Sequence, residues 1–209
     1  MDSYRILISG GEAEITEKKS RFIATIRPVN SEEEAAGCIG ELKKKYWDAK
    51  HNCYAYVIGA DGGYTRCSDD GEPGGTAGRP MLEVLLNEKI CNVLAVVTRY
   101  FGGVLLGTGG LVRAYSQAVK EGLAVCRKGY LGKGAEYLIQ TDYNDVGKIL
   151  RIMGKYGLDQ GESEYGADVL TRVIVEKERE TMFLREVADA TCGRAVSEKL
   201  NDVPVIRQE

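Results

Sequence analysis

Hydrophobic positions along the chain predict strands and helices in two successive groups. Apolar residues at every second position predict strands, and apolar residues three or four positions apart predict helices. In the first group the predicted strands are 4–9, 12–16, 21–28, 53–58, 64–67 and 91–98, and the predicted helices are 31–46, 81–88 and one that begins near Gly110. Gly10 and Gly11 predict a tight turn, so we expect the first two strands to form a hairpin.

Two elements of this group have the clearest patterns. Helix 31–46 opens with Ser31 and Glu34, a capping-box pair that satisfies free backbone N–H groups at the start of a helix. Residues 91–98, CNVLAVVT, are nearly all apolar, which is typical of a strand buried on both faces. We therefore expect this strand to lie in a sheet that is covered on both sides.

The second group follows a glycine-containing segment, residues 129–134, that predicts a linker. We expect two domains, 1–128 and 135–209. The predicted strands of the second domain are 135–141, 158–164, 168–176 and 203–207, and its predicted helices are 144–156 and 179–192. Their order, β-α-β-β-α-β, is that of the ferredoxin-like split βαβ unit. The predicted fold class is therefore α+β with two domains.

Charge and composition restrict the classes of function. The 209 residues carry a formal net charge of -3, and residues 131–209 contain 11 basic and 15 acidic residues, so no global basic field attracts nucleic acid. Any site for an anion must therefore be local. Six cysteines without a C-x-x-C pair indicate reduced thiols in a cytoplasmic protein. No apolar run approaches the roughly 18 residues of a membrane span, so no membrane partner is expected.

The stretch 96–118, VVTRYFGGVLLGTGGLVRAYSQA, contains the main candidate residues. Its glycines would expose backbone N–H groups just before a helix, where unpaired donors and the helix dipole favour an anion. An arginine beside aromatic residues can hold a phosphate and stack a base. The candidate ligand-binding residues here are Arg99, Tyr100, Phe101, Gly102, Gly103, Gly107, Thr108, Gly109, Gly110 and Arg113. The alternative is a tight turn whose aromatic residues pack in the core.

A second candidate segment is the loop 68–80, SDDGEPGGTAGRP, which shows no periodic pattern. Long loops of this kind tend to carry function. Its candidate residues are Asp69, Asp70, Glu72, Thr76 and Arg79. The three carboxylates could hold a hard cation such as Mg²⁺, pair with Arg79, Arg99 or Arg113, or stay solvated. We favour pairing, and we expect the two loops to form one site.

His51, the only histidine, is a further candidate for this site, although a lone histidine is more often a structural hydrogen-bonding group. The glycine stretch has neither the G-x-x-x-x-G-K-[ST] phosphate loop nor the G-x-G-x-x-G dinucleotide fingerprint, so the sequence leaves the identity of any cofactor open. The residues favour binding over turnover without deciding whether a reaction is catalysed.

Four ordered motifs resemble the YigZ/IMPACT family. They are Ser20-Arg21-Phe22, AKHNCYA at 49–55, DDGEPGGTAGRP at 69–80, and TRYFGG with GTGGLVRAY between 98 and 115. The resemblance implies an N-terminal α+β domain similar to domain IV of elongation factor G, and a C-terminal ferredoxin-like domain similar to its domain V. It also implies a link to translation, because the eukaryotic members resemble regulators that interfere with activation of a starvation-sensing kinase. They do so through an additional N-terminal domain, for which this chain has no room.

Three functions follow from the residues and the resemblance together. The first is a non-enzymatic, translation-linked regulator that binds RNA, a ribosomal site or another phosphate-bearing ligand through the two loops. The second is a regulator that binds a protein partner through the C-terminal domain. The third is an Mg²⁺-dependent enzyme acting on a phosphorylated small molecule. We place them in that order.

Overall fold

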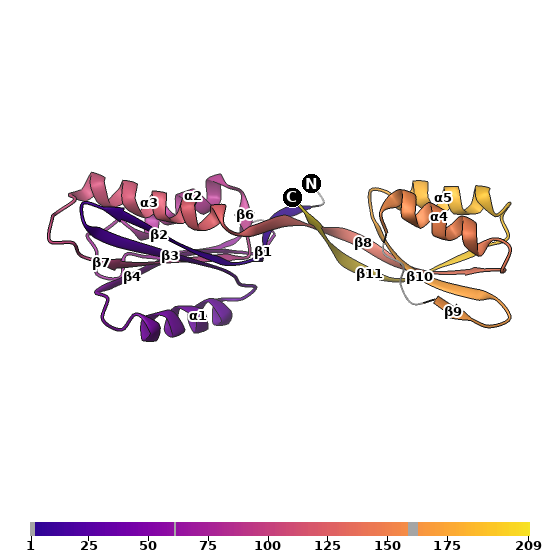
Figure 1. The fold of residues 1–209 in the computed structure, drawn as a ribbon, viewed down its shortest axis with the longest axis horizontal. Coiled ribbons are helices and arrows are strands. Elements are labelled where there is room, and N and C mark those ends of the chain that lie inside the picture. The colour runs from indigo at the N-terminus through magenta and orange to yellow at the C-terminus, as the bar shows by residue number, and fades with distance from the viewer. Residues whose placement is uncertain (1–2, 61, 159–162) are drawn as a thin grey trace. The chain divides into compact units, whose positions relative to one another are not determined.

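The computed structural model describes residues 3–60, 62–158 and 163–209 (Figure 1). Within these ranges the fold is mixed α+β, with two sheets and five helices. The chain divides into two compact units. The N-terminal unit comprises Tyr4–Tyr130 with Gln208–Glu209, and most of the C-terminal unit is Leu131–Arg207. No helix in the described ranges is long and apolar enough to cross a membrane.

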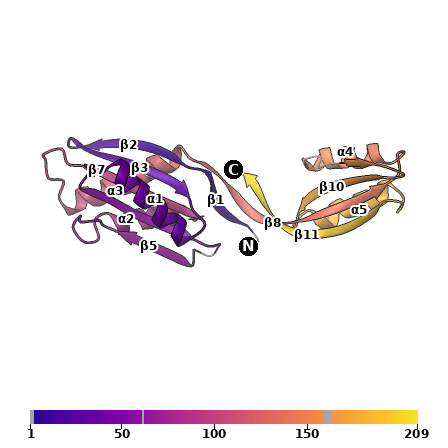
Figure 2. The same cartoon turned by 90° about the horizontal axis from the view of Figure 1, so that it is seen from below.

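The N-terminal unit is organised around a five-stranded antiparallel sheet. In spatial order its strands are β2 (Gly11–Glu17), β3 (Ser20–Pro28), β7 (Val93–Tyr100), β4 (His51–Ile58) and β5 (Tyr64–Ser68). Helix α1 (Glu32–Lys45) covers one face, and helices α2 (Gly78–Asn87) and α3 (Thr108–Ala124) cover the other (Figure 1, Figure 2).

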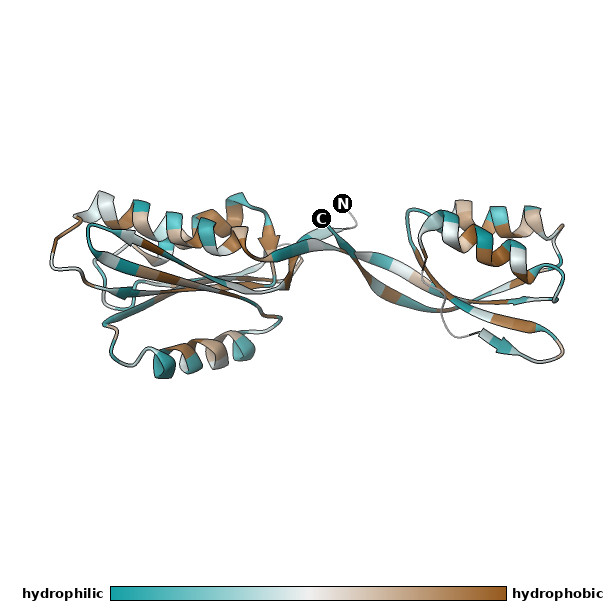
Figure 3. Cartoon of the chain, in the orientation of Figure 1, coloured by the Kyte–Doolittle hydropathy of each residue, from teal (hydrophilic) through white to brown (hydrophobic). Residues whose placement is uncertain are grey.

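Strand β7 is buried on both faces, as its apolar run predicts. Leu94 and Val96 belong to the core beneath α1, whereas Val93, Ala95 and Val97 belong to the core beneath α2 and α3. Figure 3 shows apolar and polar positions alternating along the strands and helices of this unit. Because successive side chains of a strand point to opposite faces, this packing fixes the direction of the polar residues that end β7.

Helix α1 begins at the predicted cap. The Ser31 hydroxyl accepts a hydrogen bond from the Glu34 backbone N–H at 3.2 Å. The Glu34 carboxylate bonds the N–H of Asn30 at 2.7 Å, one residue before the position expected for a capping box. Three lysines in the last turn interact favourably with the negative end of the helix dipole.

The predicted strand 91–98 is divided in two. Ile90–Cys91 forms the short strand β6, and β7 begins at Val93 and continues to Tyr100. Asn92, between them, adopts a φ of 54°, a left-handed conformation that asparagine tolerates better than most residues. Its side-chain oxygen accepts a hydrogen bond from the Gly59 N–H at 3.0 Å, which holds the break in place.

The predicted hairpin between the first two strands is wrong. Strand β1 (Tyr4–Ser9) pairs with β6 and β8 (Arg127–Thr141), whereas β2 pairs with β3. A Cβ atom at Gly10 would lie 2.2 Å from the Ile26 carbonyl oxygen. Gly10 therefore serves a close crossing over β3 instead of a turn. Helices α2 and α3 also begin earlier than predicted, at Gly78 and Thr108.

The C-terminal unit has the predicted β-α-β-β-α-β order. Its elements are β8, α4 (Val146–Tyr156), β9 (Ser163–Tyr165), β10 (Val169–Glu176), α5 (Glu180–Ala190) and β11 (Val196–Gln208). The strands lie in the order β11-β8-β10-β9. Ile149 and Met153 of α4 pack with Phe183 and Val187 of α5 in a core of their own.

Two boundaries in this region differ from expectation, and a third lies largely outside the described residues. The predicted linker 129–134 lies inside β8, because strand pairing continues through its glycines, and Gly134 pairs with Glu176. A Cβ atom at Gly134 would lie 2.4 Å from Val205, so this glycine permits close packing. The predicted strand 158–164 falls largely outside the described residues, and only 163–165 is seen as strand. Strand β11 is longer than the predicted 203–207.

We predict that Gly122→Ala destabilises the protein by about 1–3 kcal/mol through overpacking. A Cβ atom at Gly122 would lie 2.8 Å from Cγ1 of Ile26, which is fully buried and has no room to move. The control is Gly37→Ala on α1, where an added Cβ meets nothing within 4 Å. That change should stabilise by about 0.5–1 kcal/mol. Urea unfolding measures the free energy of unfolding of both variants. If Gly122→Ala stabilised the protein as much as Gly37→Ala does, the prediction would be contradicted.

Candidate functional site

The predicted site residues at the end of β7 divide between the two faces of the sheet. Arg99 faces α2 and α3, where its guanidinium pairs with Glu72. Tyr100 donates a hydrogen bond to Asp48 at 2.8 Å, beyond the end of α1. Strand alternation therefore separates two neighbouring residues that the sequence groups together.

Arg99, Glu72 and Tyr115 form a buried network. Arg99 Nη1 donates to Glu72 Oε1 at 2.7 Å, and the Tyr115 hydroxyl donates to the same oxygen at 2.8 Å. The two charged side chains are only 7% and 3% exposed. The acidic loop is therefore joined to both β7 and α3 through one carboxylate oxygen.

Cys53 completes this network and remains protonated. Its sulfur lies 3.3 Å from the Tyr115 hydroxyl oxygen and 3.0 Å from the Asp69 carbonyl oxygen, and its one S–H proton can be donated to either of them. Burial, with the nearby carboxylates, raises the pKa of the Cys53 thiol to about 12. Burial is also the main cause that raises the pKa of Tyr115. Neither group ionises at neutral pH, so Cys53 is a poor nucleophile.

Aromatic rings and Ser20 complete the surroundings of Arg99. Its guanidinium carbon lies 5.4 Å from the centre of the Phe22 ring and 5.6 Å from that of Phe101. The Ser20 hydroxyl lies 3.5 Å from Nη2 and accepts from the Gly102 N–H at 3.1 Å. Within the described part of the chain, Nε has no hydrogen-bond partner. The contacts of the Arg99 guanidinium are therefore with Glu72, Ser20 and the two aromatic rings of the same unit.

Asp69 organises the acidic loop through the backbone. Its carboxylate accepts hydrogen bonds from the N–H groups of Gly75, Ala77 and Gly78 at 2.8–2.9 Å. Burial by itself would raise the pKa of Asp69, but these three donors outweigh it and lower the pKa. Asp69 therefore holds the start of α2, where unpaired N–H groups need an acceptor.

The other candidates in the loop have separate partners. Asp70 accepts from the Asn52 N–H at 2.7 Å and pairs with Lys43 at 2.6 Å, and its carbonyl oxygen lies 2.9 Å from His51 Nδ1. Thr76 donates to a carbonyl within the loop, and Arg79 pairs with Glu83 at the surface. Of the three alternatives for the carboxylates, pairing with arginine holds for Glu72 only. No group of three metal-ligating side chains occurs in the described residues.

The exposed part of the glycine stretch leads into α3. Gly107 precedes the helix with a φ of 73°, and Thr108, Gly109 and Gly110 form its first turn. In the described residues, no side chain caps this end. The Arg113 guanidinium points back toward the start of α3. A Cβ atom added at Gly109 would lie 3.8 Å from Arg113 Nη1, which shows this proximity. Cationic and backbone donors are thus close together.

A groove of about 440 Å³ lies between α3 and the turn that joins β2 to β3. Three cations line it, Lys18, Arg113 and Lys120, with Glu17 as the one carboxylate. None of the three cations forms an ion pair among the described residues. Neither lysine is among the site residues that the sequence predicts. Arg113 and Lys120 are seven residues apart, a spacing that places them on one helix face.

Comparisons with known proteins identify the family of this chain. The family model of the Impact N-terminal domain matches residues 18–123, and a domain of unknown function (DUF1949) matches 139–194. "IMPACT family member YvyE" of Bacillus subtilis is 40% identical over 93% of this chain and 90% of its own length. "IMPACT family member YigZ" of Escherichia coli is 38% identical over 84% of this chain and 87% of its own length. This chain is therefore a two-unit α+β protein of the IMPACT family, as its motifs predict.

Two further comparisons show how far the likeness extends. A solved structure described as "Crystal structure of an hypothetical protein" covers 96% of this chain and 98% of its own, with a TM-score of 0.62 and 34% identity. "Protein IMPACT" of Mus musculus is 38% identical over 44% of this chain but only 30% of its own length. The Impact N-terminal match includes the buried network and the three cations of the groove.

We predict that Glu72→Ala and Arg99→Ala each destabilise the protein by about 3–5 kcal/mol, because each leaves a buried charge without its partner. The loss of unfolding free energy in the double variant should be smaller than the sum of the losses in the two single variants, by at least about 0.5 kcal/mol. Denaturant unfolding of all four proteins measures this coupling. The exposed pair Arg21–Glu14 on the same sheet is the control and should show almost none. Additive losses at Arg99 and Glu72 would contradict the prediction.

Asp69 gives a pH-dependent prediction. Its folded pKa is lowered, so ionised Asp69 stabilises the protein above the unfolded pKa of about 3.9, and this contribution is lost as pH falls through the folded pKa. Asp69→Asn should therefore destabilise the protein strongly at pH 7 and progressively less as pH falls below about 3.9, when the free energies of unfolding of both proteins are measured with denaturant. Asp189→Asn, at a side chain that is 74% exposed, is the control. A difference independent of pH would count against this role.

Proposed function

We propose that this protein is a non-enzymatic, translation-linked regulator that binds RNA, at a ribosomal or another site, through the cationic groove beside the glycine stretch. Membership of the IMPACT family suggests a translation-related regulator. The observation that carries the RNA part is the convergence of Lys18, Arg113 and Lys120 on one groove. Three cations that form no ion pair with any described residue are suited to a polyanion.

The local electrostatics support an anionic ligand despite the net charge of -3. Arg113 lies against the first turn of α3, where backbone N–H groups and the helix dipole already favour negative charge. A cation at that position destabilises an isolated helix, and a bound phosphate would offset this effect. Among the described residues, Glu17 is the only acidic group on the groove wall.

The acidic loop supports binding over Mg²⁺-dependent turnover. Asp69 is occupied by three backbone N–H groups, Asp70 by Lys43 and a backbone N–H, and Glu72 by Arg99 and Tyr115. Using them as metal ligands would leave buried donors unpaired, which costs about 1–3 kcal/mol each. In this proposal the loop is the scaffold of the site, and the groove contacts the ligand.

We predict that Arg113→Ala weakens RNA binding and reduces the salt dependence. Loss of one phosphate contact to a single strand should lower the slope of log K against log salt concentration by about 0.7. Fluorescence anisotropy with a labelled oligoribonucleotide between about 50 and 200 mM salt measures both effects. The matched control is Arg185→Ala in the C-terminal unit, which removes an equal charge from a side chain that is 83% exposed. The absence of salt-sensitive binding, or an equal effect of both variants, would overturn the proposal.

A further inference from the structure

Exposed apolar side chains occur on two segments, 47 and 101–105, at the end of the N-terminal sheet where β7 stops. They are Trp47, Phe101, Val104 and Leu105, with exposed fractions of 81%, 54%, 43% and 82%. We call these four residues the tip cluster. Several exposed apolar groups at one end of a domain can mark an interaction site.

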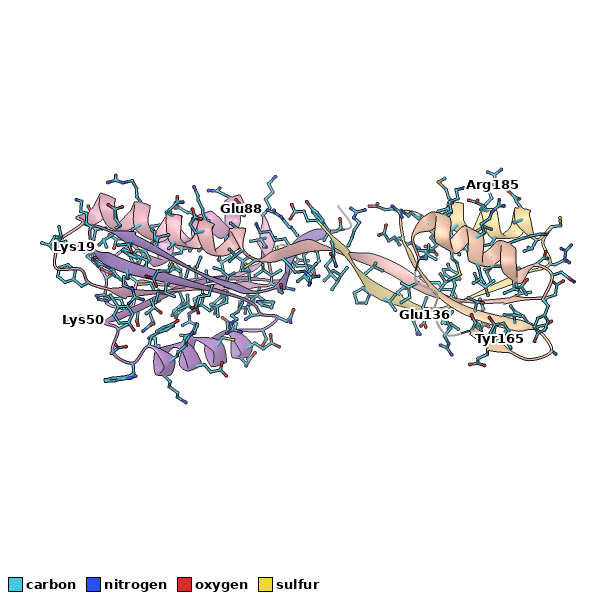
Figure 4. The ribbon with its side chains drawn as sticks, in the orientation of Figure 1. Lys19, Lys50, Glu88, Glu136, Tyr165 and Arg185 are labelled. Atoms are coloured by element: carbon cyan, nitrogen blue, oxygen red, sulfur yellow. The ribbon has the colours of Figure 1, made fainter. Side chains whose placement is uncertain are left out.

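Contacts between the segments show that they share this end. Trp47 precedes Asp48, whose carboxylate binds Tyr100, and Phe101 follows Tyr100. A Cβ atom at Gly102 would lie 2.0 Å from the Lys19 backbone, so the β2–β3 turn touches the same loop. Figure 4 shows Lys19 and Lys50 at this end of the unit.

The tip cluster is bordered by positive charge. Lys18, Lys19 and Lys50 are exposed, and within the described residues none of them forms an ion pair. This pattern fits a partner that combines negative charge with flat apolar surfaces. Phosphates and unpaired bases of a nucleic acid strand supply both.

Phe101 is held in a fixed position for such a contact. The Arg99 guanidinium stacks near its ring at 5.6 Å, and Arg99 is itself anchored by the buried carboxylate of Glu72. About half of the Phe101 side chain remains open to solvent. An anchored cation against one part of the ring leaves the other part as a rigid platform, so little conformational freedom is lost when a base stacks.

We infer that the RNA is recognised as a single strand, whose unpaired bases stack on Phe101 and Trp47 while its phosphates contact the surrounding lysines. This inference rests on the proposed function and specifies its ligand. Bases in a duplex are already stacked and paired, so they cannot use these rings. The left-handed conformations of Gly103 and Gly107, with φ of 83° and 73°, give the loop that carries Leu105 a shape that other residues rarely adopt.

The test compares three labelled ligands of equal length by anisotropy: a single-stranded oligoribonucleotide, its duplex, and an abasic strand with the same phosphates. We expect the single strand to bind at least about fivefold more tightly than the abasic strand. Phe101→Ala should reduce the ratio of the affinity for the single strand to the affinity for the abasic strand, and Phe101→Trp should restore this ratio. Tyr165→Ala, at an exposed tyrosine of the C-terminal unit, should leave the ratio unchanged.

Trp47 provides a second readout, because it is the only tryptophan of the chain. A stacked base should quench its emission, whereas the abasic strand should not. Salt-sensitive binding with equal affinity for all three ligands would overturn the inference and leave the proposed function standing. No binding to any of them would overturn both. A blue shift of Trp47 with phosphatidylserine vesicles, and no response to RNA, would assign the tip cluster to a lipid surface and also overturn the inference.

Discussion

The buried ion pair between Arg99 and Glu72 is the interaction on which the rest of the site depends. Two charges removed from water are tolerated only when their partners are well placed, and here Tyr115 adds a second donor to the same carboxylate oxygen. The pair connects the central strand, the acidic loop and α3. It therefore sets the positions of three segments that are far apart in the sequence, and it supports the aromatic ring that follows on the loop.

The residues that hold the loops in place are different from the residues whose side chains are open to solvent. The conspicuous residues of the two loops, Asp69, Glu72 and Arg99, are buried or saturated with internal hydrogen bonds. The groups left open to a ligand are less conspicuous in the sequence: a lysine in a hairpin turn, a second lysine on α3 and apolar side chains of a glycine loop. In the proposed function, the motif residues therefore form the framework of the site, and the surface that contacts the ligand lies beside them.

The sequence predicts the fold well wherever one physical signal dominates. The apolar run of β7 predicts burial on both faces, and Ser31 with Glu34 predicts the start of α1. Prediction fails where tertiary contacts decide. Gly10 and Gly11 look like a turn in the sequence, but Gly10 allows the chain to pass close to the backbone of Ile26. The glycines of 129–134 continue a strand because neighbouring strands pair with it. No local pattern distinguishes these uses of glycine.

The site is predicted less completely than the fold. Opposite charges on the two loops predict a pairing, and Glu72 with Arg99 shows it. The choice of Glu72 over its neighbours depends on packing, as does the role of Asp69, whose acceptor geometry exists only once α2 has formed. Lys18 and Lys120 are missed because their convergence with Arg113 requires the β2–β3 turn to lie against α3.

The double use of Glu72 Oε1 has a consequence for the motions of the acidic loop. The loop cannot lift away without leaving Arg99 and Tyr115 as unpaired donors inside the core. Its opening is therefore part of the same cooperative unit as the central sheet, even though its composition is that of a mobile surface segment. The amide hydrogens of Gly75, Ala77 and Gly78 bond Asp69 within this loop, so we expect their exchange with solvent to be slowed toward the rate of the core.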